Sequence, residues 1–97
     1  MSKHDSDKYM PSLTYTSALR AASQVRKYGI EKYGSAEDWL TTEPIRHLDA
    51  AIRHIRAHMD GEERDPGSSF LHLAHALTNI MFEIERLYRV KDVKIFE

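Results

Sequence analysis

Two carboxylates in the sequence have a spacing that suits metal binding. Glu62 and Asp65 lie three positions apart in the segment Gly61-Glu62-Glu63-Arg64-Asp65. In a turn or a helix, residues at that spacing point their side chains in the same direction. Paired oxygen ligands that leave coordination positions open suit Mg²⁺ or Mn²⁺, which usually bridge to substrate phosphates. A solvated acidic turn between two helices is the competing interpretation.

A second polar group follows and would share one face of a helix. At spacings of three, four and four, the chain places His72, His75, Asn79 and Glu83. Imidazole suits Mn, Fe, Co, Ni or Zn better than Mg, and a neutral imidazole can also contact a phosphate or act as a general base near pH 7. Two histidines hydrogen-bonded at the edge of a core would give the same pattern.

A third, basic group precedes both of these. It consists of His47, Arg53, His54 and His58, in a segment with helical spacing. The planar guanidinium of Arg53 could hold a phosphate, with His54 facing the same ligand. A solvated basic face is the alternative.

Upstream of this group lies a segment with aromatic and basic residues. Lys32 and Tyr33 could contact the phosphates and the base of a nucleotide, or could simply line a loop. Trp39 is predicted to fill the core beneath that loop.

Three helices must position these residues. Apolar spacing predicts the first over residues 16–28, with Gly29 as its C-terminal stop. The second should begin at Pro44 and end near residue 59, and the third should begin at Ser68 or Ser69 and end near residue 89. Residues 30–42 read as a loop or short irregular turn. For the tail, residues 90–97, a short strand and an arm packed on a second subunit both stay open.

The predicted second and third helices each carry a narrow apolar seam beside their polar stripe. A hairpin of these two helices would bring the polar stripes together near the Glu62/Asp65 turn. The seams also suit a four-helix assembly across a dimer axis. We therefore expect an all-α fold: a small bundle of three main helices, completed by dimerisation, with residues 1–12 as a flexible segment and residues 13–97 as a single helical domain.

The composition narrows the class of partner. The formal net charge of −1 gives no global basic field for binding nucleic acid, so an anionic ligand needs a local basic patch. The chain has no cysteine, which fits a reducing cytoplasm and excludes thiolate metal sites. No apolar run reaches the roughly 18 residues that span a bilayer. We predict a cytoplasmic protein without membrane association.

Several short motifs occur in a specific order. They are Glu31-Lys32-Tyr33-Gly34, Asp38-Trp39, Ala51-Ile52-Arg53-His54, Gly61-Glu62 with Asp65, and His72-Leu73-Ala74-His75-Ala76 with Asn79. In order and spacing the chain resembles the phage-associated dATP/dGTP diphosphohydrolase N-terminal family over about residues 30–85. Its pattern is roughly K-Y-G-x-x-N-W, R-H, G-E-x-x-D-x-E-S-G, H-L-A-H-A and a downstream N.

The resemblance implies a helical domain akin to MazG-like pyrophosphohydrolases, which cleave a nucleoside triphosphate to a monophosphate and pyrophosphate with Mg²⁺ or Mn²⁺. Those enzymes work as dimers or higher oligomers. Carried over to this chain, the resemblance implies a site formed by Glu62, Asp65, His72, His75 and Asn79. Arg53 and His54 would face that site, and Lys32 and Tyr33 would belong to a substrate loop.

The chain departs from the family pattern at two places. Asp38 stands where the family has Asn before Trp, and Gly67-Ser68-Ser69 stands where the family has E-S-G, so one carboxylate is missing. The full E-x-x-E plus E-x-x-D signature of MazG-like enzymes is also absent, and Glu62 and Asp65 supply only its second half.

Two functions from different classes follow. The first is a metal-dependent nucleoside triphosphate pyrophosphohydrolase acting on purine deoxynucleotides. Glu62, Asp65 and His75 would be catalytic, and the metal ligands would be Glu62, Asp65, His72 and His75; the two histidines also admit another divalent transition metal. Lys32, Tyr33, Arg53, His54 and Asn79 would bind substrate. The second is a non-catalytic phage sponge that sequesters a signalling nucleotide, which the missing carboxylate favours. A plain helical interaction module with structural histidines is a third reading.

Overall fold

Helices account for most of the residues that the computed structural model describes, which are residues 8–89. The long helices are α1 (Thr16–Tyr33), α2 (Pro44–Met59) and α3 (His72–Arg89). Two short 3-10 helices, η1 (Pro11–Leu13) and η2 (Asp38–Thr41), precede α1 and α2. The part of the chain described contains no strand, only an isolated bridge between Arg64 and Leu71. The predicted all-α class with three main helices is confirmed.

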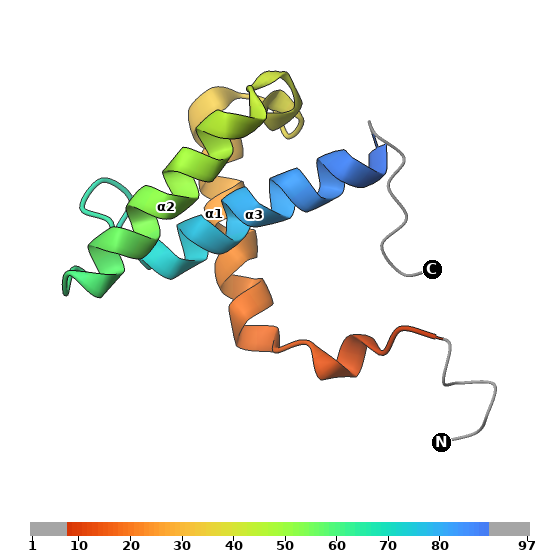
Figure 1. Ribbon diagram of the computed structural model, residues 1–97, viewed down its shortest axis with the longest axis horizontal. Helices are drawn as coiled ribbons and strands as arrows, with labels where there is room; N and C mark the ends of the chain where they lie inside the picture. Colours follow the sequence, from red (N-terminus) through yellow and green to blue (C-terminus); the bar gives the residue numbers. More distant parts are fainter. Residues whose placement is uncertain (1–7, 90–97) are drawn as a thin grey trace.

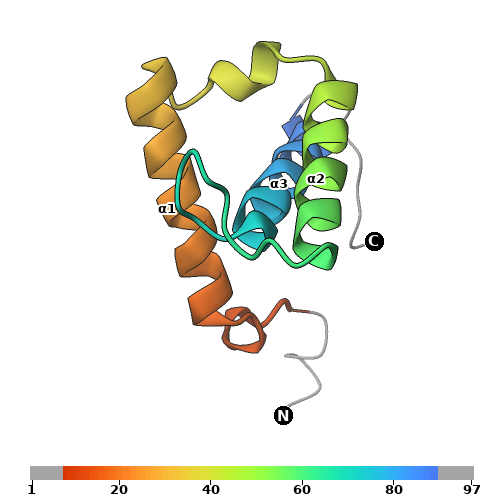
Figure 2. The ribbon, with the colours of Figure 1, turned by 90° about the vertical axis from the view of Figure 1, so that its left-hand side faces the viewer.

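The three long helices enclose a space rather than packing all together. α2 packs along α3, as the predicted hairpin requires, and α1 lies across α3 (Figure 1). Turned by 90°, the structure shows α1 and α2 standing apart, joined at one end by the segment that contains η2 (Figure 2). The loop between α2 and α3 reaches α1, where the Phe70 and Tyr28 rings meet edge to face at 5.8 Å.

Helix α1 runs five residues further than the sequence predicts, to Tyr33 instead of residue 28. Gly29 does not stop it, although a mid-helix glycine costs about 1 kcal/mol relative to alanine. The helix ends at Gly34, which adopts φ 81° and donates its backbone N–H to the carbonyl of Ile30 at 2.7 Å. Glycine occupies this left-handed position without steric cost. The additional residues include Lys32 and Tyr33, which therefore lie on a helix rather than in a loop.

Helix α2 has the predicted bounds because both of its ends carry strong local signals. Pro44 occupies the first turn, where its missing N–H is tolerated. At the other end the chain turns through Asp60 and Gly61, which has φ 99°. These two signals do not depend on the rest of the fold.

Helix α3 begins at His72 and not at Ser68 or Ser69. The carbonyl of Asp65 accepts the Ser69 N–H at 2.7 Å, and the Asp65 carboxylate accepts the Ser68 N–H at 2.9 Å. Ser69 adopts φ 67°, outside the helical region. The serines therefore belong to a hydrogen-bonded turn around Asp65 and do not cap the helix.

The core is small and built on alanine and aromatic side chains. Its buried apolar members are Ala22, Val25, Trp39, Ala51, Ala74 and Ala76. The Trp39 ring stacks on Phe82 with centroids 5.0 Å apart. Trp39 thus fills the core under the segment before α2, as predicted.

A buried arginine fixes η2 against α3. Arg86 donates to the backbone carbonyls of Trp39, Leu40 and Thr42 at 3.0, 2.9 and 2.8 Å and pairs with Glu83 at 3.1 Å. These bonds give partners to carbonyls at the end of η2 and at its C-terminal cap, Thr42.

The predicted apolar seams face outward in the single chain. On α2 and α3 their members Ile45, Leu48, Ile52, Leu73 and Ile80 are exposed, each by 39% or more. The inward face of α2 instead carries His47 and Ala51, which are both buried. The seams are available for the expected dimer contact, which stays a prediction.

Two predictions concern residues at the chain ends. The expected tail conformation, residues 90–97, lies outside the described residues, as do residues 1–7 of the expected flexible segment 1–12. Within the described range, no helix has the length and apolar character to cross a membrane.

Candidate functional site

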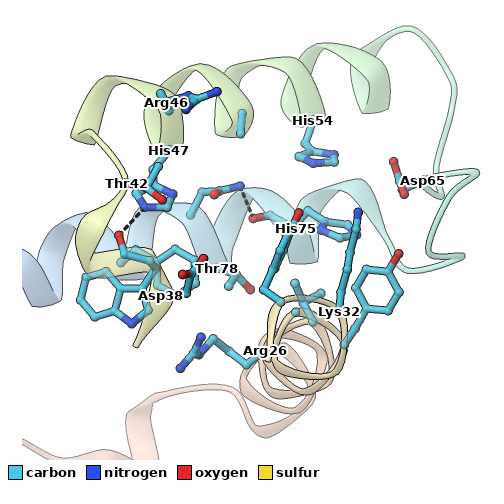
Figure 3. Close-up of a pocket in the computed structure, with 18 of the residues that line it drawn as sticks. Arg26, Lys32, Asp38, Thr42, Arg46, His47, His54, Asp65, His75 and Thr78 are labelled. Atoms are coloured by element: carbon cyan, nitrogen blue, oxygen red, sulfur yellow. Dashed lines mark hydrogen bonds between the residues drawn. The ribbon is translucent and has the colours of Figure 1, made fainter. Parts of the chain in front are cut away.

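A cleft of about 600 Å³ lies between α1 and α2, with α3 as its floor. That volume is in the range of small-molecule sites. Figure 3 shows how the chain surrounds it: α2 carries Arg46 and His54 along one side, Lys32 on α1 lies opposite, and Asp65 and Asp38 stand at the two ends. Basic and acidic side chains from elements far apart in the sequence therefore converge on one space.

A chain of hydrogen bonds links three groups beside the Asp65 end. The Nδ1 atoms of His54 and His72 lie 2.7 Å apart, and the His72 Nε2 lies 2.7 Å from Glu62 Oε1. His72 is buried, with 4% of its surface exposed, whereas the Glu62 side chain is 52% exposed. Glu62 therefore contacts the buried imidazole from outside the cleft, which it does not line.

His75 adds a third imidazole to this cluster. Its ring stacks on His54 with centroids 4.5 Å apart and an interplanar angle of 9°. Its Nε2 lies 2.7 Å from the Ser68 hydroxyl oxygen. The backbone carbonyl of His75 accepts the Asn79 side-chain N–H at 3.0 Å. His75 and Asn79 both belong to the predicted polar stripe, and both line the cleft.

The turn after α2 holds Asp65 in place. Its carboxylate accepts the Ser68 N–H, and a Cβ on Gly67 would come within 3.3 Å of Oδ2. Burial favours the neutral carboxyl, but the hydrogen bonds from the Ser68 backbone and side chain, aided by His75 and His54, lower the pKa of Asp65 below its usual range. Asp65 is therefore a carboxylate at neutral pH and the anionic group at this end of the cleft.

The two half-buried histidines favour their neutral forms. Burial and the neighbouring His75 and His72 lower the pKa of His54. Burial likewise lowers the pKa of His75, although Asp65 partly opposes the shift. Both imidazoles are thus available at pH 7 as metal ligands or proton acceptors.

Three of these groups can hold a metal ion. One ligand atom from each of His54, Asp65 and His72 lies within 4.8 Å of the others. Two imidazole nitrogens and a carboxylate oxygen are a donor set that binds divalent cations. Of the predicted ligands, the structure thus brings Asp65 and His72 together, and it adds His54 to them. Glu62 contacts this cluster through His72. His75 contacts it through Ser68 and the His54 ring.

The predicted phosphate-binding residues separate into two groups. Lys32 and Tyr33 line the cleft, and the Lys32 ammonium lies 5.3 Å from the Tyr33 ring centroid. Arg53 is exposed on α2 and is not among the residues that line the cleft. A phosphate contact by Arg53 stays a prediction.

The sequence interpretation missed Arg46, which lines the cleft from the first turns of α2. A usable signal exists, since Arg46, Ala50 and His54 are four positions apart and share a helix face. Asp38 and Thr42 also line the cleft. Their position depends on how η2 is held, and no local pattern predicts that.

His47 belongs to the framework of the site. It is buried, and its Nε2 donates to the Trp39 carbonyl at 3.0 Å. The same carbonyl accepts a bond from Arg86. His47 therefore fixes η2 against the start of α2 and shapes the Asp38 end of the cleft.

The family to which the chain belongs follows from a comparison of its sequence with known families. The model of the family described as dATP/dGTP diphosphohydrolase, N-terminal, matches residues 1–94. No curated protein and no solved structure matches the chain. The match covers nearly the whole sequence and includes every residue of the cleft. The chain is therefore a member of the dATP/dGTP diphosphohydrolase N-terminal family.

Proposed function

We propose that the protein is a divalent-metal-dependent hydrolase of purine deoxynucleoside triphosphates that releases a monophosphate and pyrophosphate. The observation that carries this proposal is the cleft itself. A His and Asp cluster capable of holding a cation lies at one end, and the cations Lys32 and Arg46 line the walls. The family description supplies the substrate class.

The basic residues would hold the triphosphate. Lys32 offers a flexible ammonium from α1, and Arg46 offers a planar guanidinium from α2 on the opposite side. Charge on the phosphate oxygens rises toward the transition state, so these two groups would stabilise it more than the ground state. Tyr33 and Asn79 line the same cleft and would position the nucleotide.

His54, Asp65 and His72 would hold the divalent cation. When bound there, such a cation supplies Lewis-acid polarisation of a phosphoryl oxygen. The lowered pKa values of His54 and Asp65 keep both groups in the form that binds a cation at neutral pH.

His75 would accept the proton of the attacking water. Its lowered pKa keeps the ring neutral at pH 7. With the ring proton on Nε2 and donated to the Ser68 hydroxyl oxygen, Nδ1 would carry the lone pair that can take a proton. The stacked His54 ring and the Ser68 contact fix the orientation of the imidazole.

One observation favours the second function, nucleotide binding without hydrolysis. Gly67, which stands where the family pattern has a glutamate, lines the cleft beside Asp65. The missing carboxylate would thus have been in the site itself. A protein that lacks only this group would retain the basic walls and could still sequester a nucleotide.

The test is to incubate purified, tag-free protein with each dNTP and NTP plus a divalent cation, and to separate the products by chromatography. Monophosphate and pyrophosphate from dATP or dGTP are the expected products. Intact nucleotide that binds tightly in calorimetry would establish the sequestering function in place of the hydrolase.

A further inference from the structure

We infer that the His54/Asp65/His72 cluster selects a nitrogen-preferring divalent cation of the first transition row over Mg²⁺, with Glu62 orienting the ligand His72 from outside. The inference rests on the proposed metal dependence but not on turnover. It gives the metal a chemical class and gives Glu62 a positioning role in place of the ligand role expected from the sequence.

The contacts of His72 fix the orientation of its ring. Both of its ring nitrogens are engaged, Nε2 by the Glu62 carboxylate and Nδ1 by His54, each at 2.7 Å. A carboxylate only accepts, so the His72 Nε2 carries a proton, and in the neutral ring Nδ1 presents a lone pair. A carboxylate that accepts from the far nitrogen of a metal-binding histidine fixes the tautomer and raises the basicity of the ligand.

His54 has to change its tautomer and move slightly when a cation binds. With both rings neutral and no cation bound, the His54 Nδ1–H would donate to the lone pair of His72 Nδ1 across 2.7 Å. When a cation takes both nitrogens, the His54 proton moves to Nε2, and the ring stays neutral. Two nitrogens at about 2.1 Å from one ion lie roughly 3.0 Å apart at an octahedral angle and roughly 3.4 Å apart at a tetrahedral angle. Compared with the present 2.7 Å, the rings need to separate by roughly 0.3 to 0.7 Å.

The numbers of nitrogen and oxygen donors in the cluster suit a transition metal better than Mg²⁺. Mg²⁺ requires oxygen ligands in octahedral geometry. The cluster offers one carboxylate, Asp65, whose Oδ2 already accepts the Ser68 N–H at 2.9 Å. The other nearby carboxylate, Glu62, is bound to the outer nitrogen of His72. Two nitrogens and one oxygen match Co²⁺, Ni²⁺ or Zn²⁺, and three protein ligands leave positions open for phosphate oxygens.

The experiment is a titration of tag-free protein with Co²⁺, followed by visible absorption and calorimetry. We expect one equivalent to bind with new d–d bands, and a hundredfold excess of Mg²⁺ to leave the bands in place. His54→Ala should abolish them. Glu62→Gln should weaken Co²⁺ binding about 10- to 100-fold, as is typical when such an outer carboxylate is lost, while its neighbour Glu63→Gln should bind like the wild type.

Displacement of Co²⁺ by comparable Mg²⁺, or full Co²⁺ binding by His54→Ala, would overturn the inference. Equal affinities of the Glu62→Gln and Glu63→Gln variants would overturn the role given to Glu62. Co²⁺ bound as expected with every nucleotide left intact would instead contradict the proposed hydrolase and leave the metal assignment standing. Hydrolysis supported by Mg²⁺ alone, unaffected by His54→Ala, would do the reverse.

Discussion

At the scale of single residues, the site combines two opposite charge environments within one cleft. Lys32 and Arg46 supply positive charge to its walls, whereas Asp65 and neutral imidazoles form the end where a cation would bind. A nucleoside triphosphate with a divalent cation has the complementary arrangement, since its phosphate oxygens can contact the basic walls and also a cation held at the other end. The contribution of each side chain to ligand binding therefore depends on which part of the cleft it lines.

Lys32→Ala should weaken nucleotide binding because it removes one of the three cationic side chains that line the cleft, the others being Arg26 and Arg46. We expect the dissociation constant for dGTP, measured by calorimetry, to rise about tenfold, which corresponds to about 1.4 kcal/mol. The control is Lys27→Ala on the same helix, which is exposed and is not among the cleft-lining residues. Equal affinities of the two variants would remove Lys32 from the phosphate site.

The histidine cluster should make the fold sensitive to acid. The folded-state pKa values of His54 and His75 are lowered, mainly by burial, so the unfolded chain binds protons more readily. The stability that neutral imidazoles provide is therefore lost as pH falls below about 6.5, their ordinary pKa. Urea denaturation between pH 7.5 and 5.5 should show falling stability, and His54→Gln should show a shallower decline. An equally steep decline in that variant would contradict the assignment.

How far the sequence predicts the site depends on whether a residue's position follows from its own helix. Helical spacing places the polar stripes on one face of each helix, and the connection between the helices brings these faces together. The predicted hairpin therefore correctly anticipates that His54, His72 and His75 converge. That Glu62 contacts His72 from outside the cleft depends on the path of the turn after α2. That path is set by tertiary hydrogen bonds around Asp65, which spacing alone does not encode.

At the scale of the elements, helix ends were predictable where one residue dictates the backbone. Pro44 does so at the start of α2, and the predicted boundary is correct. At Gly29 the local signal gives the wrong end of α1, because the helix continues to Gly34. Weak propensity is readily outweighed by packing, whereas a positive φ strongly favours glycine.

Two glycine substitutions on α1 should have opposite effects on stability. Gly34→Ala places a Cβ at φ 81° and should destabilise the fold by about 1 kcal/mol. Gly29→Ala lies within the helix, where a Cβ would meet nothing within 4 Å, and should stabilise it by about 0.5–1 kcal/mol. Urea denaturation measures both, and a stabilising Gly34→Ala would contradict the cap.

Arg86 should be the polar residue on which the position of η2 depends most. Arg86→Ala removes three bonds, to the carbonyls of Trp39, Leu40 and Thr42, and leaves the Glu83 carboxylate without its partner. We expect a loss of about 3 kcal/mol in the free energy of unfolding. The control is Arg89→Ala, whose ion pairs with Glu37 and Glu85 lie on the surface, and its denaturation midpoint should stay near that of the wild type. Similar midpoints for both variants would contradict the role of Arg86.

At the scale of the whole molecule, the single chain leaves much apolar surface uncovered. The seams on α2 and α3 expose Ile45, Leu48, Ile52, Leu73 and Ile80, while alanines make up much of the buried core. Large exposed apolar residues gathered along two packed helices are typical of an interface. A second copy packed seam to seam would complete a four-helix arrangement on the side of α3 away from the cleft.

Light scattering coupled to size exclusion should therefore give a mass twice that of the chain. Ile52→Lys, which places a charge in the seam, should convert the protein to a monomer. Tyr15→Lys changes a large hydrophobic residue just before α1 that is 83% exposed, against 45% for Ile52, and should leave the dimer intact. A monomeric wild type, or a dimer lost only in Tyr15→Lys, would contradict the seam as the interface.

The proposed hydrolase activity can be tested directly by a ³¹P NMR time course of dGTP and dATP with the protein and a divalent cation. Asp65→Asn serves as the matched blank, since it keeps the size of the side chain and removes its charge. We expect growing pyrophosphate and monophosphate signals with the wild-type protein and none with Asp65→Asn. Unchanged triphosphate signals with the wild type, or equal turnover by the variant, would contradict it.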